Sequence, residues 1–261
     1  MIYKFCAETD TGLARANNED SVAFDESAGL AVLADGMGGY NAGEVASGMA
    51  TALIKAEMGR WLAETGGRAG PRDIRRAMEI CVDNANRSIF SAANTNAQYT
   101  GMGTTLVMGV FQGSRLLLGH IGDSRCYRLR RGLLVQVTRD HSLLQEQIDA
   151  GLLTPQQAAT SMNKNLVTRA LGVDNAVMLE LNDCQVEDGD LYLMCSDGLS
   201  DMVSDAKIAE ILEQRTPLAQ RAQSLIHAAN EGGGRDNTTV LLVQAEAVSE
   251  RRRLIARLLG K

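Results

Sequence analysis

The sequence has few prolines, few histidines and no closely spaced cysteines, and each shortage excludes a class of protein. Three prolines in 261 residues provide no proline-rich linker or hinge between domains. Three histidines and five cysteines, with no Cys-x-x-Cys pair, give no indication of a zinc site. The widely spaced cysteines instead predict buried, reduced thiols. A catalytic cysteine is the alternative, although the sequence places no histidine beside one.

A signal sequence, a membrane span and an excess of positive charge are also lacking. The N-terminus shows no charged-then-apolar pattern, and no apolar run has the length of a membrane span. The net charge of −6 argues against a nucleic-acid surface. We therefore expect a cytoplasmic protein, monomeric, that binds neither nucleic acid nor membranes.

The chain does contain an ordinary globular mixture, with 45% hydrophobic and 22% charged residues. Its periodicity predicts strands at 3–9, 21–26, 29–35, 104–111, 115–121, 125–129, 133–137, 177–184, 190–195 and 238–244. It predicts helices at 42–64, 71–93, 143–150, 155–159, 204–214 and 217–230. Connections of hairpin length favour antiparallel sheets, and helical pairs between blocks of strands favour helices that cover those sheets.

Three aspartates lie beside or near glycines, at the border of apolar strands. Asp35 and Asp197 each follow an apolar run and precede a glycine, whereas Asp236 follows three glycines and leads into an apolar run. A carboxylate in such a place is costly unless a cation, a donor or water meets it. Oxygen ligands without histidine or cysteine favour Mg²⁺ or Mn²⁺ over zinc. The alternative is that Asp-Gly pairs simply mark turns.

Two further polar runs could contribute to the same chemistry. Arg15 lies five residues before Asp20, and arginine can hold a phosphate through two parallel hydrogen bonds. The alternative is a solvated polar loop. Asp123 lies between two predicted strands and offers one more carboxylate at a turn.

Eight short runs, in this order, resemble the metal-dependent serine/threonine protein phosphatases of the protein phosphatase 2C type, in their compact bacterial form. Each run alone is weak, but the ordered set is specific and covers residues from about 12 to 243. The runs are Arg-x-x-Asn-Glu-Asp at 15–20, Asp-Gly-Met-Gly-Gly at 35–39, Gly-Thr-Thr at 103–105, Gly-Asp-Ser-Arg at 122–125, Asp-His-Ser at 140–142, Thr-Arg-Ala-Leu-Gly at 168–172, Ser-Asp-Gly-Leu at 196–199 and Asp-Asn-Thr-Thr at 236–239.

The resemblance implies an α+β fold, a four-layer α-β-β-α sandwich of two antiparallel sheets. It also implies two bound Mn²⁺ or Mg²⁺ ions. Asp35 resembles the carboxylate that bridges both ions, and Gly36 the residue whose carbonyl binds one of them. Asp197 and Asp236 resemble ligands of the other ion. Asp123 resembles a ligand of the third, weaker metal of bacterial members.

The resemblance also implies residues that act on water and substrate. Asp20, with Glu19 beside it, would hold metal-bound water, and Arg15 would capture the substrate phosphate. Asn237 would orient the neighbouring carboxylate. Some eukaryotic members carry a histidine directly after the Asp-Gly pair, where it resembles a general acid. Met37 stands there in this chain, so leaving-group protonation by metal-bound water is expected, or little acid assistance.

The implied activity is hydrolysis of phosphoserine and phosphothreonine on proteins by a hydroxide that bridges the metals, with a bacterial serine/threonine kinase as the opposing partner. We expect a catalytic domain at 1–246 with a flap-like insert at about 143–165. The flap either selects peptide sequence or is a surface helix pair. The tail at 247–261 is basic and amphipathic. Packing on the domain is the expectation for the tail, with partner or membrane docking as alternatives.

Overall fold

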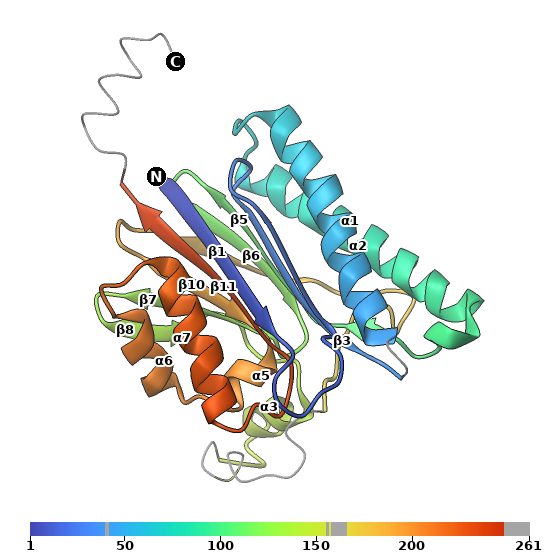
Figure 1. The fold of residues 1–261 in the computed structure, drawn as a ribbon. Helices are drawn as coiled ribbons and strands as arrows, with labels where there is room; N and C mark the ends of the chain where they lie inside the picture. The colour runs from blue at the N-terminus through green and yellow to red at the C-terminus, as the bar shows by residue number, and fades with distance from the viewer. Residues whose placement is uncertain (40–41, 155–156, 158–165, 248–261) are drawn as a thin grey trace.

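The computed structural model describes residues 1–39, 42–154, 157 and 166–247, and these residues form two antiparallel sheets with helices on the outer faces (Figure 1). One sheet has the order β1 (Ile2–Asp10), β11 (Thr238–Glu246), β10 (Leu191–Cys195), β7 (Arg125–Arg130) and β8 (Leu133–Gln136). The other has the order β2 (Asp20–Asp25), β3 (Leu30–Met37), β5 (Leu106–Gln112), β6 (Arg115–Ile121) and β9 (Glu180–Gln185). The two-residue strand β4 (Gly103–Thr104) pairs with the end of β3.

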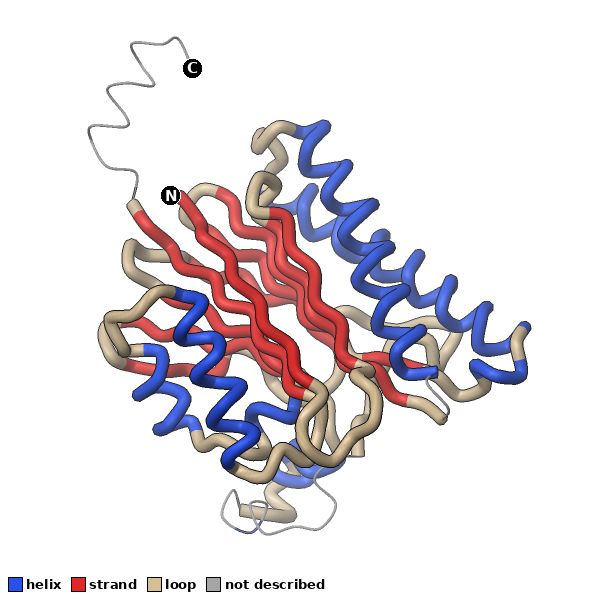
Figure 2. Tube along the Cα trace, viewed as in Figure 1, coloured by secondary structure: helices blue, strands red, loops and turns tan. Residues whose placement is uncertain are grey.

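Two pairs of helices complete the four layers, as Figure 2 shows in blue against the red sheets. The second sheet is covered by α1 (Ala42–Thr65) and α2 (Pro71–Thr95), and the first by α6 (Asp205–Leu212) and α7 (Leu218–Glu231). The smaller helices are η1 (Ala97–Tyr99), α3 (Leu143–Asp149) and α5 (Asp197–Ser200). None of the helices within the described residues combines the length and the hydrophobicity that a bilayer crossing requires.

Alternation along the central strands explains the three cores between these layers. Leu191 and Leu193 on β10 pack against helices, while Tyr192 and Met194 face the other sheet. Successive side chains of a strand point to opposite faces, so a strand that is apolar at every position has both faces buried. The apolar runs found in the sequence are therefore the strands between a helical layer and the opposite sheet.

The predicted four-layer α+β sandwich is confirmed, with a few local corrections. The predicted strand 104–111 is interrupted at Thr105, and the predicted strand 177–184 begins only at Glu180. Two elements were not predicted, η1 and the one-turn helix α5, which are too short to show a period. The predicted helix at 155–159 and the tail from 248 lie outside the described residues, apart from residue 157. All five cysteines are free, as expected, but only Cys81, Cys126 and Cys195 are buried, whereas Cys6 and Cys184 are partly exposed.

Candidate metal centre

The first part of the site is built on two neighbouring strands of the second sheet. Asp35 on β3 and Asp20 at the start of β2 are cross-strand partners. The backbone of Asp35 is fixed on the other side by Thr105, whose hydroxyl accepts its N–H at 2.9 Å and whose own N–H donates to its carbonyl at 2.8 Å. The break in the strand at Thr105 thus anchors the backbone at Asp35.

The first sheet contributes two more aspartates. Asp197 begins α5 directly after β10, and Asp236 lies in the loop before the neighbouring strand β11. The two segments touch at Gly198, where a Cβ would lie 2.0 Å from the carbonyl oxygen of Asn237. Gly36 is equally constrained, since a Cβ there would lie 2.1 Å from the carbonyl oxygen of Gly43. The glycines that follow Asp35 and Asp197 therefore allow the close approach that brings the acidic segments together.

We expect Gly198→Ala to destabilise the protein strongly, because its new methyl group would meet backbone atoms that cannot move independently. Gly48→Ala is the matched control, since nothing lies within 4 Å of a Cβ there and the residue is inside α1. That substitution should stabilise the protein by about 0.5–1 kcal/mol, because alanine favours a helix. Urea denaturation of both variants measures the difference, and equal stabilities would contradict the close packing at Gly198.

A serine joins the two sheets at the site. The Ser196 hydroxyl donates to Asp20 Oδ2 at 2.7 Å and accepts the Thr239 N–H at 2.9 Å. Ser196 is fully buried between β10 and β11, whereas Asp20 belongs to the other sheet. Ser196 opens the Ser-Asp-Gly-Leu run at 196–199, but the family resemblance gave it no role. Its position shows that it holds Asp20 of one sheet against the acidic segments of the other.

The carboxylates of the two sheets raise one another's pKa values. The pKa of Asp35 lies well above its ordinary value, because of burial first and then of the charges on Asp20, Asp197, Asp123 and Asp236. Burial also raises the pKa of Asp197 well above its ordinary value, and Asp123 and Asp236 add to the rise. Burial raises the pKa of Asp20 to about 6, with a further contribution from Asp236. Carboxylates from both sheets therefore share one region with excess negative charge.

Asp123 enters this region from the turn between β6 and β7. It is only 8% exposed, and burial followed by the charge of Asp140 raises its pKa to about 6. The preceding Gly122 has a φ of +98°, and a Cβ there would lie 2.7 Å from Thr105 Cγ2. Because only glycine fits this conformation and this space, the turn brings Asp123 close to the residue that anchors Asp35.

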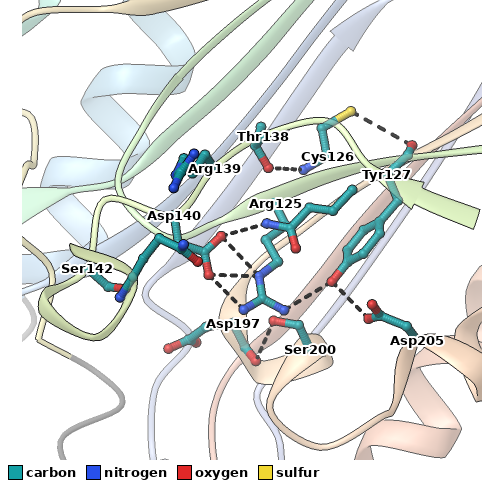
Figure 3. Close-up of polar contacts among 12 residues, drawn as sticks. Arg125, Cys126, Tyr127, Thr138, Arg139, Asp140, Ser142, Asp197, Ser200 and Asp205 are labelled. Carbon is teal, nitrogen blue, oxygen red and sulfur yellow. Dashed lines mark hydrogen bonds and ion pairs between the residues drawn. The ribbon is translucent and has the colours of Figure 1, made fainter. Parts of the chain in front are cut away.

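Two residues after Asp123, Arg125 forms a largely buried ion pair with Asp140, which Figure 3 shows beside Asp197. The guanidinium of Arg125 donates to both carboxylate oxygens of Asp140, at 2.7–3.1 Å. It also donates to the Tyr127 hydroxyl at 3.0 Å, which in turn donates to Asp205 at 3.2 Å. Arg125 is thus committed to Asp140 and Tyr127.

The remaining predicted residues are Arg15 and Glu19, in the loop before β2, and Asn237, whose side chain contacts that loop. Arg15 pairs with Asp236 Oδ2 at 2.7 Å, and its side chain is 50% exposed. The Glu19 carboxylate accepts the N–H of Gly43 at the start of α1, while its own N–H donates to the side chain of Asn237 at 2.8 Å. Asn237 reaches the Asp236 carboxylate only through its backbone N–H, because its side chain bonds to the backbone of the 11–19 loop.

The residues present fit hard divalent cations. The donors are carboxylate oxygens, and Asp20 Oδ1 is buried without a hydrogen-bond partner. The raised pKa values of Asp35 and Asp197 show that the negative charge there lacks compensation. In the described part of the chain, the three ligand-type side chains that have donor atoms within 4.8 Å of one another are His120, His141 and Glu180, not the aspartates. The ligand atoms of a two-ion site need not all lie this close together, since they are shared between ions about 3.5–4 Å apart.

We expect the metal-free protein to lose stability as the pH rises from about 4 to about 7. Asp20 and Asp123 have a folded pKa of about 6 against an ordinary value of 3.8. In this window the folded state binds more protons than the unfolded state, so the free energy of unfolding falls with rising pH. Melting temperatures in chelator between pH 4.5 and 7.5 measure the slope, and Asp123→Asn should make it shallower. A slope that this substitution leaves unchanged would contradict the assignment.

Comparisons with known proteins agree with this geometry. The model of the family described as protein phosphatase 2C matches residues 14–253. The serine/threonine protein phosphatase PstP of Mycobacterium tuberculosis is 43% identical over 242 residues, which are 93% of this chain but only 45% of PstP. The serine/threonine phosphatase Stp of Listeria innocua is 36% identical over 247 residues, 94% of this chain and 96% of that protein.

A solved structure is also similar to this chain. The crystal structure of the PstP catalytic domain in complex with two manganese ions is 40% identical, with a TM-score of 0.81, and the match covers 94% of this chain and 99% of that one. The family profile, both relatives and this structure span the segments that carry the aspartates. The chain therefore belongs to the protein phosphatase 2C family.

Proposed function

We propose that this protein hydrolyses phosphoserine and phosphothreonine esters on other proteins and depends on Mn²⁺ or Mg²⁺. The observation that carries the proposal is the convergence of aspartates from both sheets, led by Asp35, with pKa values raised by burial and by one another. Such a cluster holds hard cations. The names of the relatives and the two manganese ions of the PstP structure support the same activity.

In this proposal the ions are held by the side chains of Asp35, Asp197 and Asp236 and by the carbonyl of Gly36. Asp123 contributes to a third, weaker site. When bound, the ions supply positive charge that acidifies water and offsets the charge of the phosphoryl oxygens. The carboxylates in turn place that charge at the junction of the two sheets.

Asp20 and Arg15 act on the reactants. Asp20 Oδ1 is buried and has no partner, while Ser196 holds the other oxygen, so Oδ1 can accept a hydrogen bond from the attacking water. Arg15 pairs with Asp236 at the exposed edge of the site. An arginine that is half exposed can turn from a carboxylate to a phosphate, because both present oxygens to the same planar fork.

No histidine of the described residues is placed to protonate the leaving group. Met37 ends β3 at the position where a histidine acts in some family members. His120 bonds to the carbonyl of Arg139, His141 bonds to Gly122 and Glu180, and the exposed His227 pairs with Glu231 on α7. We therefore propose that the leaving oxygen is protonated from water. His120→Ala and His141→Ala should keep the acidic limb of the pH–rate profile.

The wider setting is part of the proposal. A serine/threonine kinase supplies the phosphorylated substrates, and the enzyme works as a monomer in the cytoplasm. The five free cysteines support a reducing compartment. Residues 1–246 form the catalytic domain with a flap at about 143–165, and 247–261 is a basic amphipathic tail that packs on the domain. The family profile reaches residue 253, into the first part of that tail.

The test is phosphate release from a phosphothreonine peptide after chelation and stepwise addition of Mn²⁺. Turnover should require the metal and should be lost in Asp197→Asn. Asp183→Asn is the control and should retain full activity. Asp183 lies on β9 in an exposed ion pair with Arg115, outside the aspartate cluster. Turnover without metal, or in Asp197→Asn, would refute the proposal. A higher kcat/KM for small phosphate esters than for the peptide would indicate a metabolite phosphatase.

A further inference from the structure

Outside the aspartate cluster, two buried histidines and a partly exposed glutamate lie together and have no role in the proposed reaction. His120 on β6 and Glu180 on β9 are cross-strand partners, and His141 lies against both. The two histidine rings stack with centroids 4.7 Å apart and planes 15° from parallel. His120 is fully buried and His141 is 6% exposed. Their donor atoms and a Glu180 oxygen lie within 4.8 Å of one another, the spacing of a metal site.

The hydrogen bonds exclude a metal at this group. The N–H of Gly122 donates to His141 Nδ1 at 3.1 Å, so Nδ1 must carry the lone pair. The proton of the neutral ring is then on Nε2, which donates to Glu180 Oε2 at 3.0 Å. A metal on Nε2 would move the proton to Nδ1, against the Gly122 N–H. The guanidinium of Arg169 also lies 3.5 Å from Nε2 and would repel a cation.

We propose instead that Glu180 and His141 are positioning residues for the turn that carries Asp123. Glu180 accepts the Nε2 proton and thereby fixes the tautomer in which Nδ1 is an acceptor. His141 then holds the turn twice, since Nδ1 accepts the Gly122 N–H and its own backbone N–H donates to the Gly122 carbonyl at 2.9 Å. A carboxylate that orients a histidine is a common supporting arrangement at metal sites.

The neighbouring contacts favour this one arrangement. His120 cannot replace Glu180 as the acceptor, because its ring is stacked on His141 and its unpartnered Nδ1 lone pair, which lies in the ring plane, is not aimed at His141 Nε2. The Nε2–H of His120 donates to the carbonyl of Arg139 at 2.9 Å. The carbonyl of His141 accepts the N–H of Thr168 at 2.8 Å, which fixes the histidine backbone as well. The turn itself needs support, because Gly122 has a positive φ and packs closely against Thr105.

The inference rests on the proposed function in one respect, the role of Asp123 in a third metal site. If Gly122 loses its acceptor, the Asp123 carboxylate loses a fixed position. We then expect weaker metal binding there, and unchanged binding at the two sites built on Asp35 and Asp197. Glu180 and His141 touch neither the metal ligands nor the substrate in this arrangement, so their effect on turnover passes through Asp123.

Two substitutions at residue 141 separate positioning from packing. In His141→Asn the amide oxygen takes the place of Nδ1 and can still accept the Gly122 N–H, whereas His141→Leu offers similar bulk and no acceptor. Calorimetric titration with Mn²⁺ should show about 10-fold weaker binding of the weakest ion in the leucine variant. The asparagine variant should bind close to wild type. Equal affinities in the wild type and the leucine variant would overturn the proposal.

Nuclear magnetic resonance of the metal-free protein tests the relay without activity or metal. Long-range proton–nitrogen spectra should show the Nε2–H tautomer for His141 in the wild type. Glu180→Ala, at a side chain that is 39% exposed, should lose this single tautomer and shift the Gly122 amide resonance. An Nδ1–H tautomer in the wild type, or an unshifted Gly122 amide, would overturn the relay.

These readouts keep the two proposals apart. If the phosphothreonine peptide is not hydrolysed but the tautomer and the Gly122 shift are as expected, the proposed function fails and the relay stands. If turnover is metal-dependent but His141 lacks the Nε2–H tautomer, the relay fails and the function stands.

Discussion

Asp35→Asn is expected to reduce turnover of a phosphothreonine peptide by about 10³-fold, the largest effect on activity among the single substitutions considered. Asp35 is the residue whose pKa responds to burial and to all four other aspartates of the cluster. Its backbone is fixed by Thr105, so an asparagine would occupy the same place without the charge. The loss should therefore come from weaker cation binding and not from a displaced strand.

The metal-free protein gives the complementary result. Asp35→Asn would remove one charge from a cluster in which like charges oppose one another, so the melting temperature in chelator should rise. The increase in melting temperature on adding Mn²⁺ should shrink, because ligand stabilisation grows with affinity. Asp183→Asn should change neither the melting temperature in chelator nor its increase on adding Mn²⁺ by a comparable amount. Wild-type turnover in Asp35→Asn would be incompatible with a role for this carboxylate in holding the metal.

Asp140→Asn is expected to lower the free energy of unfolding by about 3 kcal/mol, because it removes the charge that pairs with a largely buried arginine. The substitution leaves the Arg125 guanidinium, 26% exposed, without its carboxylate partner (Figure 3). Burial opposes the charged guanidinium, and hydrogen bonds from Arg125 to Asp140 offset that cost. Urea denaturation at constant pH measures the loss.

A surface ion pair provides the control for this experiment. Asp83 pairs with Arg87 one turn along α2, and the side chains are 41% and 65% exposed. Asp83→Asn should cost less than about 1 kcal/mol, because water solvates both partners. Similar losses in the two variants would mean that burial does not distinguish these pairs. Asp140→Asn should also lower the pKa of Asp123, since Asp140 is the main charge that raises it.

The roles of Asn237 and Arg15 show where sequence reasoning reached its limit. The sequence placed both near the site, and the structure does so too. However, the amide of Asn237 supports the backbone of the 11–19 loop, and Arg15 pairs with Asp236. A motif identifies neighbours in space, but the partner of each polar atom depends on side-chain directions that appear only when the segments are packed.

The roles of Ser196, Thr105 and Glu180 were missed for a related reason. Ser196 joins the sheets through Asp20, Thr105 anchors Asp35, and Glu180 orients His141. Their partners are 176, 70 and 39 residues away in the chain. A hydroxyl or a carboxylate in a strand gives no local signal of such a contact, because the chain neighbours of a residue are not its partners across two sheets.

The sequence by itself determined the layers of this protein and the identity of its acidic residues. Apolar alternation is a local property of each strand and helix, and the order of strands and helical pairs left few ways to bury both faces of two sheets. The tertiary structure decided which carboxylates meet, how strongly each pKa is raised, and which residues hold Asp35, Asp20 and Asp123 in place. Those properties depend on distances between segments that only the packed sandwich brings together, because burial and charge interactions act through space and not along the chain.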